Sequence, residues 1–322
     1  MRSSRKHSPL PARRSGGPIV PDTDGYPTAA GVEAAIKDAA KKASAADPSL
    51  NTNERIRLEH FNRFLSRIFS EGDDSEWVLK GGTGMLARVP SGRTTRDVDL
   101  YRNGYTLDEA LADLRRLAAI DLGDHFAFEY VSHEKSIGGA GQPYTEGYAV
   151  AFEIFIGGRS RHVLNVDLSI GAGATAEVTT VEPANALPLP KLVSHEYRLY
   201  PVVDQIADKV CATMTQYNDR SSSREKDLVD LVVFATTQDI DGTALRLAIF
   251  TESRRRRLEP FDAFTVPATW GTRYAKLSKP IPHCADYRTV DLAAGLAKRL
   301  IDPALTGDAN GRTWLHDSLT WT

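Results

Sequence analysis

Two aspartates one residue apart, Asp97 and Asp99, follow the turn Gly81-Gly82-Thr83 after thirteen intervening residues. In a strand, alternate side chains share a face, so the two carboxylates would lie about 7 Å apart and repel each other. A cation that neutralises both removes the repulsion, and two such ligands suit Mg²⁺. The backbone N–H groups of the glycine turn form an anion site for phosphates. An anion site beside a cation site is what phosphoryl or nucleotidyl transfer requires.

Other interpretations of these residues are weaker. Two acids on one strand also occur on an ordinary solvated strand face. The sequence has no GxxxxGK[ST] segment, which excludes a P-loop. Gly82, Gly84 and Ala87 match GxGxxA, but Pro90 would end the helix too early for a dinucleotide-binding βαβ unit. The strand that follows also carries two acids rather than one.

Hydrophobic periodicity and capping signals predict the elements that position these motifs. Helices are expected at 29–46, 52–69, 83–88 and 106–119, and strands at 77–79, 97–101, 126–131, 148–156 and 163–170. From about residue 188 the pattern becomes helical, with helices expected at 201–217, 224–236 and 243–250. Capping boxes are expected at Asn51 with Glu54 and at Ser222 with Glu225.

These elements predict a flexible tail at 1–26, an α/β domain with N-terminal helices at 27–185, and a mainly helical domain at 186–322. A chain of 322 residues, 41% hydrophobic and 25% charged, is ordinary for a globular protein. Its net charge of −2 means that a nucleic-acid partner would need a local basic patch. Two cysteines without CxxC spacing, no 18-residue apolar run and no secretory signal favour a cytoplasmic protein without a membrane partner.

The glycine turn and the segment DVDL together resemble the GG[ST] and [DE]h[DE]h motifs of DNA polymerase β-like nucleotidyltransferases. That superfamily takes a third carboxylate from a later strand, and the segment NVDL, which contains Asp167, looks similar. On the residues alone, Asp167 is equally well a metal ligand or an acid on a strand face. The resemblance implies an α+β fold, with a polymerase β-like core on a mixed sheet and a helical C-terminal half.

A closer resemblance is to the AbiEii/MenT nucleotidyltransferase toxins of type IV toxin–antitoxin systems. It rests on VLKGGTGMLARV, RTTRDVDLY, VDLS, QIADKVCATM and SREKDLVDLVVF, and it covers roughly residues 55–240. It implies phosphate contacts at the glycine turn and metal binding by the DVD aspartates. It also implies a phosphate-binding lysine at Lys209, a functional acid at Asp227 or Asp230, and a site threonine at Thr95.

Each of these residues also has a structural alternative. Lys209 lies at the border of the predicted apolar stripe, where a lysine can extend along the edge of a core. Asp227 would lie in the first turn of a helix, where it complements the helix dipole. A phosphate on Thr95 would add about −1.5 to −2 charge next to the metal site and compete with a triphosphate.

The resemblance implies transfer of a nucleoside monophosphate from an NTP to the 3′ end of tRNA, releasing pyrophosphate and blocking aminoacylation and translation. It implies Mg²⁺ or Mn²⁺ as cofactor and an antitoxin of the AbiEi type as partner. Two alternatives stay open: a nucleotidyltransferase that acts on a small molecule or a protein hydroxyl, and a non-catalytic nucleic-acid-binding module. The arginine run 254–257 is the candidate contact for an RNA backbone, although such runs are usually solvated faces.

Overall fold

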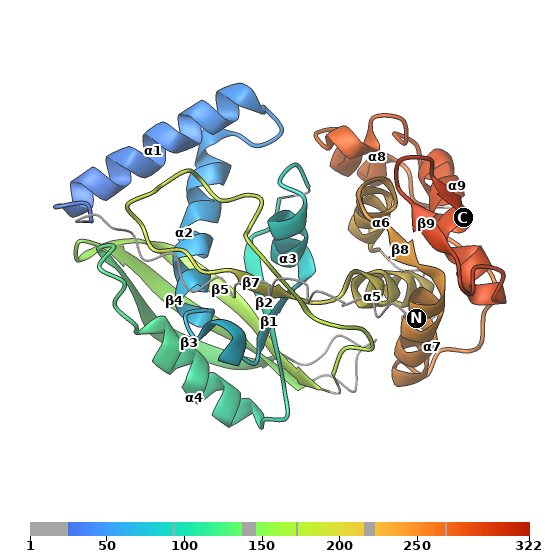
Figure 1. The fold of residues 1–322 in the computed structure, drawn as a ribbon, viewed down its shortest axis with the longest axis horizontal. Helices are drawn as coiled ribbons and strands as arrows, with labels where there is room; N and C mark the ends of the chain where they lie inside the picture. Colours follow the sequence, from blue (N-terminus) through green and yellow to red (C-terminus); the bar gives the residue numbers. More distant parts are fainter. Residues whose placement is uncertain (1–24, 93, 137–145, 172, 216–222, 268) are drawn as a thin grey trace, which may run out of the picture.

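Figure 1 shows the fold in a computed structural model, which describes residues 25–322 except 93, 137–145, 172, 216–222 and 268. A sheet with helices packed on it forms one half of the molecule, and a group of helices forms the other. The tail expected at 1–26 lies outside the described residues except for Gly25 and Tyr26.

A mixed sheet of seven strands lies at the centre of the first half. Its strands run in the order β3-β4-β5-β2-β1-β7-β6, with β2 parallel to β5, β1 parallel to β7, and the other neighbours antiparallel. The strands are β1 (Trp77–Lys80), β2 (Asp97–Asn103), β3 (Phe126–Ser136), β4 (Glu146–Ile156), β5 (Arg159–Gly171), β6 (Thr179–Val181) and β7 (Tyr197–Leu199).

Three helices, α1 (Ala29–Ala46), α2 (Thr52–Ile68) and α4 (Leu107–Ala118), contribute to one hydrophobic core with this sheet. The capping box expected at Asn51 and Glu54 is present at the start of α2. Val98 and Leu100 of β2, and Val166 of β5, enter the core. Because side chains alternate along a strand, this packing turns the intervening aspartates of β2 and β5 to the opposite face.

The second half is mainly helical and has its own core. It contains α5 (Val202–Met214), α6 (Glu225–Thr237), α7 (Gly242–Arg255), α8 (Thr272–Ser278) and α9 (Val290–Thr306), with a small antiparallel sheet of β8 (Ile240–Asp241), β9 (Thr313–Leu315) and β10 (Thr320–Trp321). Short 3₁₀ turns lie at Gly72–Asp74 (η1) and Pro282–Cys284 (η2). Met85 and Val89, from α3 (Gly81–Arg88) and the residue that ends it, join the second core. The predicted α+β class, with a mixed sheet and a helical C-terminal half, is confirmed.

The structure differs from the sequence predictions in several places. The strand β7 was not predicted, and Leu199 pairs with Leu79 in the sheet well beyond residue 185. We therefore propose that the division between the two halves falls at about Tyr200 instead. The helix α5 ends at Met214 rather than at 217, and α6 begins after Arg224, which provides no side-chain cap. The cap expected at Ser222 lies outside the described residues.

None of the helices in the described part of the chain has the length and apolar character needed to cross a membrane.

Candidate active site

Three aspartates gather on the open face of the sheet. The parallel register of β2 and β5 places Asp99 directly beside Asp167, with Asp97 two pairs earlier, opposite Asn165. Burial, and then the charge of Asp167, raises the pKa of Asp99 to about 6. Burial and the charge of Asp97 also raise the pKa of Asp167. Within the described residues, no side chain forms a hydrogen bond or ion pair with these carboxylates, so their negative charges are uncompensated by close contacts.

Gly81 is required by the carboxylate of Asp99. Its φ of +60° lies in the left-handed region that side chains rarely adopt. A Cβ at this position would come within 2.0 Å of Asp99 Oδ2. The helix α3 begins at Gly81 itself, so the glycines form the first turn of the helix rather than a separate turn before it. The N-terminal backbone amides of α3 therefore lie next to the acidic cluster, as the sequence predicted.

Two threonines hold the start of β2. The hydroxyl groups of Thr83 and Thr95 both donate to the backbone carbonyl of Asp97, at 2.7 and 3.2 Å. Arg57 donates to the carbonyl of Thr95 at 3.0 Å. Both threonine side chains are buried. These two hydroxyls therefore orient the start of β2. The contact of Thr83 with phosphate, through its backbone N–H, and the phosphorylation of Thr95 both stay predictions.

The aspartates fit a hard divalent cation, although they do not form a complete cage. Within the described residues, no three Asp, Glu, His or Cys side chains are gathered closely enough to hold a metal by themselves. Mg²⁺ is usually held by one or two carboxylates together with waters and substrate phosphates, so a complete protein cage is not needed. The oxygen-only donor set and the mutual repulsion of the carboxylates both favour such an ion.

Lys209 of α5 lies in a buried network of charges with α6. Its ammonium group is 2.6 Å from Asp230 Oδ2 and 3.5 Å from Asp227 Oδ1, and the residue is only 9% exposed. Asp227 also pairs with Arg224. The sequence left Asp227 and Asp230 as alternatives, and the structure brings both to Lys209. The charge of Lys209 nevertheless reaches Asp99, where it opposes the rise in pKa.

Comparison with known families decides which proteins this chain is related to. Residues 63–295 match the family model described as "Nucleotidyl transferase AbiEii toxin, Type IV TA system". The chain belongs to the AbiEii family. As an AbiEii protein it is a nucleotidyltransferase toxin, and the family implies an NTP substrate and an antitoxin partner. No curated protein matches the sequence.

Solved structures similar to this AbiEii protein are distant in sequence. MenT4, a nucleotidyltransferase toxin from Mycobacterium tuberculosis H37Rv, is 17% identical, with a TM-score of 0.49 over 84% of this chain and 98% of its own. JHP933 from Helicobacter pylori is 15% identical, with a TM-score of 0.40 over 78% of this chain and 94% of its own. At TM-scores below 0.5, these likenesses indicate nothing about substrate or mechanism.

Two lysines of the AbiEii protein were not predicted to belong to the site. Lys80 ends β1 and is the cross-strand neighbour of Asp99, so both side chains lie on the same face of the sheet. Lys226 lies on the exposed side of the first turn of α6. The charges of both lysines act on Asp99 and Asp167. Lys80 directly precedes the glycine turn, and Lys226 directly precedes Asp227. This position next to a motif residue is the sequence signal that could have identified both lysines.

The arginines near the aspartates have different roles. Arg102 lies within β2 and is buried, where it pairs with Asp113 and with Glu76. Its guanidinium group also covers the rings of Trp77 and Tyr105. It is therefore a structural residue of the sheet. Arg96 is exposed beside the site, and Arg93 lies outside the described residues.

Proposed function

We propose that this protein transfers a nucleoside monophosphate from an NTP to the 3′ end of tRNA, releasing pyrophosphate. The observation that carries the proposal is the placement of three carboxylates, to which no described side chain is bound, beside the glycine-rich start of α3 on the face of the sheet opposite the core. In this reaction the acceptor oxygen forms a bond to the α-phosphorus as the bond to the bridging oxygen breaks. Charge accumulates on the phosphates, and the site must neutralise it.

The carboxylates of Asp97 and Asp99, together with Asp167, are the residues we propose to hold Mg²⁺ or Mn²⁺. When bound, such an ion lowers the pKa of an acceptor hydroxyl and neutralises charge on phosphate oxygens. The register of β2 and β5 holds the three side chains on one face, and Gly81 permits the close approach of Asp99 to the backbone. The backbone amides of Gly82 and Thr83 are proposed to bind the triphosphate.

Positive charges that act on the acidic cluster come from both halves of the molecule. Lys80 extends from the sheet, and Lys226 extends from the first turn of α6. Lys209 contributes its charge from α5 and is held in place by Asp230 and Asp227. We propose that Lys80 and Lys226 contact the phosphates of the NTP and that Lys209 stabilises the departing pyrophosphate. The two acids of α6 position Lys209.

A tRNA with an added nucleotide at its 3′ end has no normal terminus for aminoacylation, so translation would stop. This outcome fits a toxin that acts in the cytoplasm, where tRNA is charged. The partner that controls it is proposed to be an antitoxin of the AbiEi type, as the family of the chain suggests.

The proposal is tested by incubating the protein with total RNA, Mg²⁺ and each labelled NTP in turn, and by sequencing the RNA 3′ ends. We expect label in tRNA with an extended 3′ end, and none with Asp97→Ala. Label in protein or in a small molecule instead would replace the acceptor but keep the chemistry. No turnover of any NTP in the presence of divalent metal and total RNA would contradict the transferase function.

A further inference from the structure

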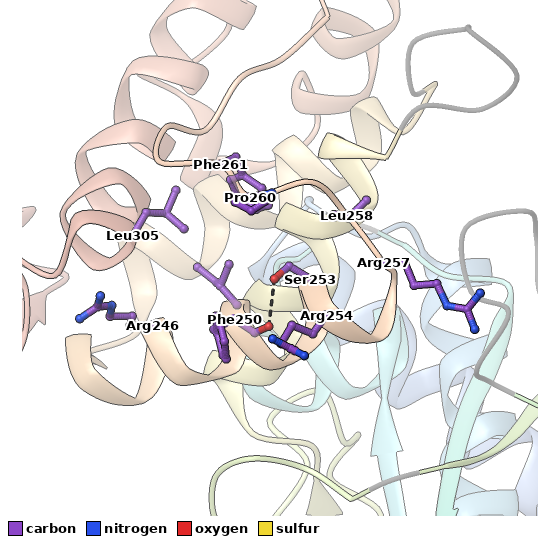
Figure 2. A pocket seen from close by; sticks show the side chains of 10 residues that line it. Arg246, Phe250, Ser253, Arg254, Arg257, Leu258, Pro260, Phe261 and Leu305 are labelled. Carbon is purple, nitrogen blue, oxygen red and sulfur yellow. Dashed lines mark hydrogen bonds between the residues drawn. The ribbon is translucent and has the colours of Figure 1, made fainter.

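A hollow lined by α7, the segment that follows it and α9 contains none of the residues of the acidic cluster (Figure 2). It has a volume of about 430 Å³, within the range of sites that bind small ligands. Apolar side chains line its floor and arginines line its rim. The lining residues are Arg246, Ile249, Phe250, Ser253, Arg254, Arg257, Leu258, Pro260, Phe261 and Leu305.

The hollow is positively charged. Arg246, Arg254 and Arg257 are exposed on its rim, and none of the described residues that line it is acidic. Glu259 and Asp262 belong to the same turn but do not line the hollow. In a protein with a net charge of −2, three arginines in one hollow form a local basic patch of the kind that a polyanion would need.

Only part of the arginine run 254–257 contributes to this patch. Arg256 is buried and pairs with Glu252 at 2.6 Å, and Arg255 donates to the carbonyl of Gly173 at 3.0 Å. These two arginines hold the end of α7 in place. Arg254 and Arg257 are therefore the members of the run that can bind a ligand, which narrows the prediction made from the sequence.

The rim also carries an aromatic platform. Phe250 is 58% exposed, so the face of its ring is accessible from solvent. The guanidinium group of Arg254 lies 5.7 Å from the centre of its ring, and Figure 2 shows both side chains at the same edge of the hollow. Arg257 directly follows the C-cap of α7, and its φ of 54° is the left-handed conformation that commonly ends a helix. The hollow thus combines stacking surfaces with phosphate-binding groups.

We propose that this hollow, called the groove from here on, binds a single-stranded segment of the acceptor RNA. Phosphates would lie at Arg246, Arg254 and Arg257, and a base would stack on Phe250. The inference rests on the proposed function and adds a second contact for the same acceptor. Arginine side chains and exposed aromatic rings are the usual elements of sites for single-stranded nucleic acid. A purely apolar protein ligand would make no use of three guanidinium groups.

The groove is separate from the NTP-binding residues. Its helix α7 packs against α5, and through Arg255 it is tied to the segment that follows β5. In Figure 1, α7 lies below α5 while α6 lies above it. Changes in the groove should therefore weaken binding of the acceptor and raise its KM, while leaving the KM for NTP and the kcat at saturating acceptor unchanged.

The test compares the full-length Arg254→Glu/Arg257→Glu variant with Arg159→Glu, because Arg159 is exposed on β5 and does not line the groove. The probe is a fluorescent single-stranded RNA ending in CCA. We expect the Kd of the double variant to rise at least tenfold and its log–log dependence on salt to become shallower by about 1.4. Phe250→Leu should raise the Kd by about tenfold with the salt dependence unchanged. The control should bind like the wild type.

Several outcomes would overturn the inference. One is an RNA affinity of the double variant equal to that of Arg159→Glu. Another is loss of binding to a poly-glutamate peptide with RNA binding intact, which would assign the groove to an acidic protein partner. If the wild type turns over NTP but the groove variants keep their acceptor KM, the groove proposal fails and the transferase proposal stands. If the wild type binds RNA through the groove but turns over no NTP, the transferase proposal fails instead.

Discussion

Two sets of charged side chains in the sheet half differ in whether other side chains neutralise them. Arg67 of α2 is completely buried, and all of its donors are satisfied by Asp124 and by the carbonyls of Arg63, Ile120 and Phe126. The carboxylates of Asp97, Asp99 and Asp167 lie side by side, and no described side chain binds them.

The difference separates charges that maintain the fold from charges that act on a ligand. A buried ion pair with every hydrogen bond satisfied is complete by itself, and breaking it leaves an unpaired charge in the core. Like charges held together without partners cost free energy in the absence of ligand. Their arrangement is useful only when a cation and a substrate neutralise them. The following predictions use this contrast, from the largest expected effect to the smallest.

Changing Asp99 to Asn should reduce nucleotidyl transfer by at least about a thousandfold, because metal binding supplies several kcal/mol to such reactions. The same change removes one of three adjacent negative charges, so the thermal midpoint should stay the same or rise. Transfer rates and thermal unfolding of the same preparation check both parts. A variant that loses stability together with activity would place Asp99 among the structural charges instead.

Changing Arg67 to Met should have the reverse pattern. We expect the free energy of unfolding to fall by about 3 kcal/mol, because Asp124 would be left buried without the cation that neutralises it. The transfer rate per folded molecule should be unchanged. Urea unfolding measures the first effect, and replacing Asp124 with Leu in the same chain should restore most of the loss. Failure of that second change to restore stability would refute the explanation.

His60 shows a third solution, in which a buried ionisable group stays neutral. It stacks on His162 with ring centres 5.0 Å apart, and its Nδ1 has no hydrogen-bond partner in the described part of the chain. Burial and the nearby charges of His162 and Arg161 lower its pKa to about 3. Below pH 6.5 the unfolded chain takes up a proton that the folded protein does not. Stability should therefore fall by about 2 kcal/mol between pH 6.5 and pH 5 from this residue alone.

Urea unfolding of the wild type and of His60→Phe across that pH range isolates this contribution. The Phe variant should lose less stability than the wild type as the pH falls. Equal losses in the two proteins would show that His60 is not the group responsible.

Changing Lys80 to Met should raise the KM for NTP by about tenfold, which corresponds to about 1.4 kcal/mol, because one charge facing the phosphates is lost. The fold should be unaffected, since Lys80 is partly exposed and forms no ion pair with Asp99 or Asp167. Lys80→Arg should recover part of the affinity. A matched change at Lys135, an exposed lysine of β3, serves as control. An unchanged KM would remove Lys80 from the phosphate-binding set.

Local sequence was sufficient for most of the first half. Asn51 with Glu54 begins α2, Thr106 with Glu109 begins α4, and the alternation of β2 and β5 turns the aspartates away from the core. These features depend on residues a few positions apart. The shared face of Asp97 and Asp99 follows from the same alternation, whereas the place of Asp167 beside Asp99 depends on the pairing of β2 with β5.

Features that depend on distant parts of the chain were not predictable. The strand β7 has three residues and is defined by its pairing with β1 across more than a hundred positions. The family resemblance implied that Lys209 binds phosphate. Its contacts with Asp230 and Asp227 could not be predicted, because they depend on how α5 packs against α6. Lys80 and Lys226 come together only because the two halves of the molecule meet. The role of each residue in the arginine run likewise depends on the neighbours of α7.

The candidate active site combines residues from both halves of the molecule. Its acids come from the sheet, and two of its lysines come from α5 and α6. The sheet belongs to one hydrophobic core, and α5 and α6 both belong to the other. A chain divided near Tyr200 would yield two fragments, one able to carry the anionic groups and the other most of the cationic ones. Neither fragment would poison a cell alone, whereas co-expression could restore toxicity. The protein is thus a natural candidate for a split reporter whose signal is growth arrest.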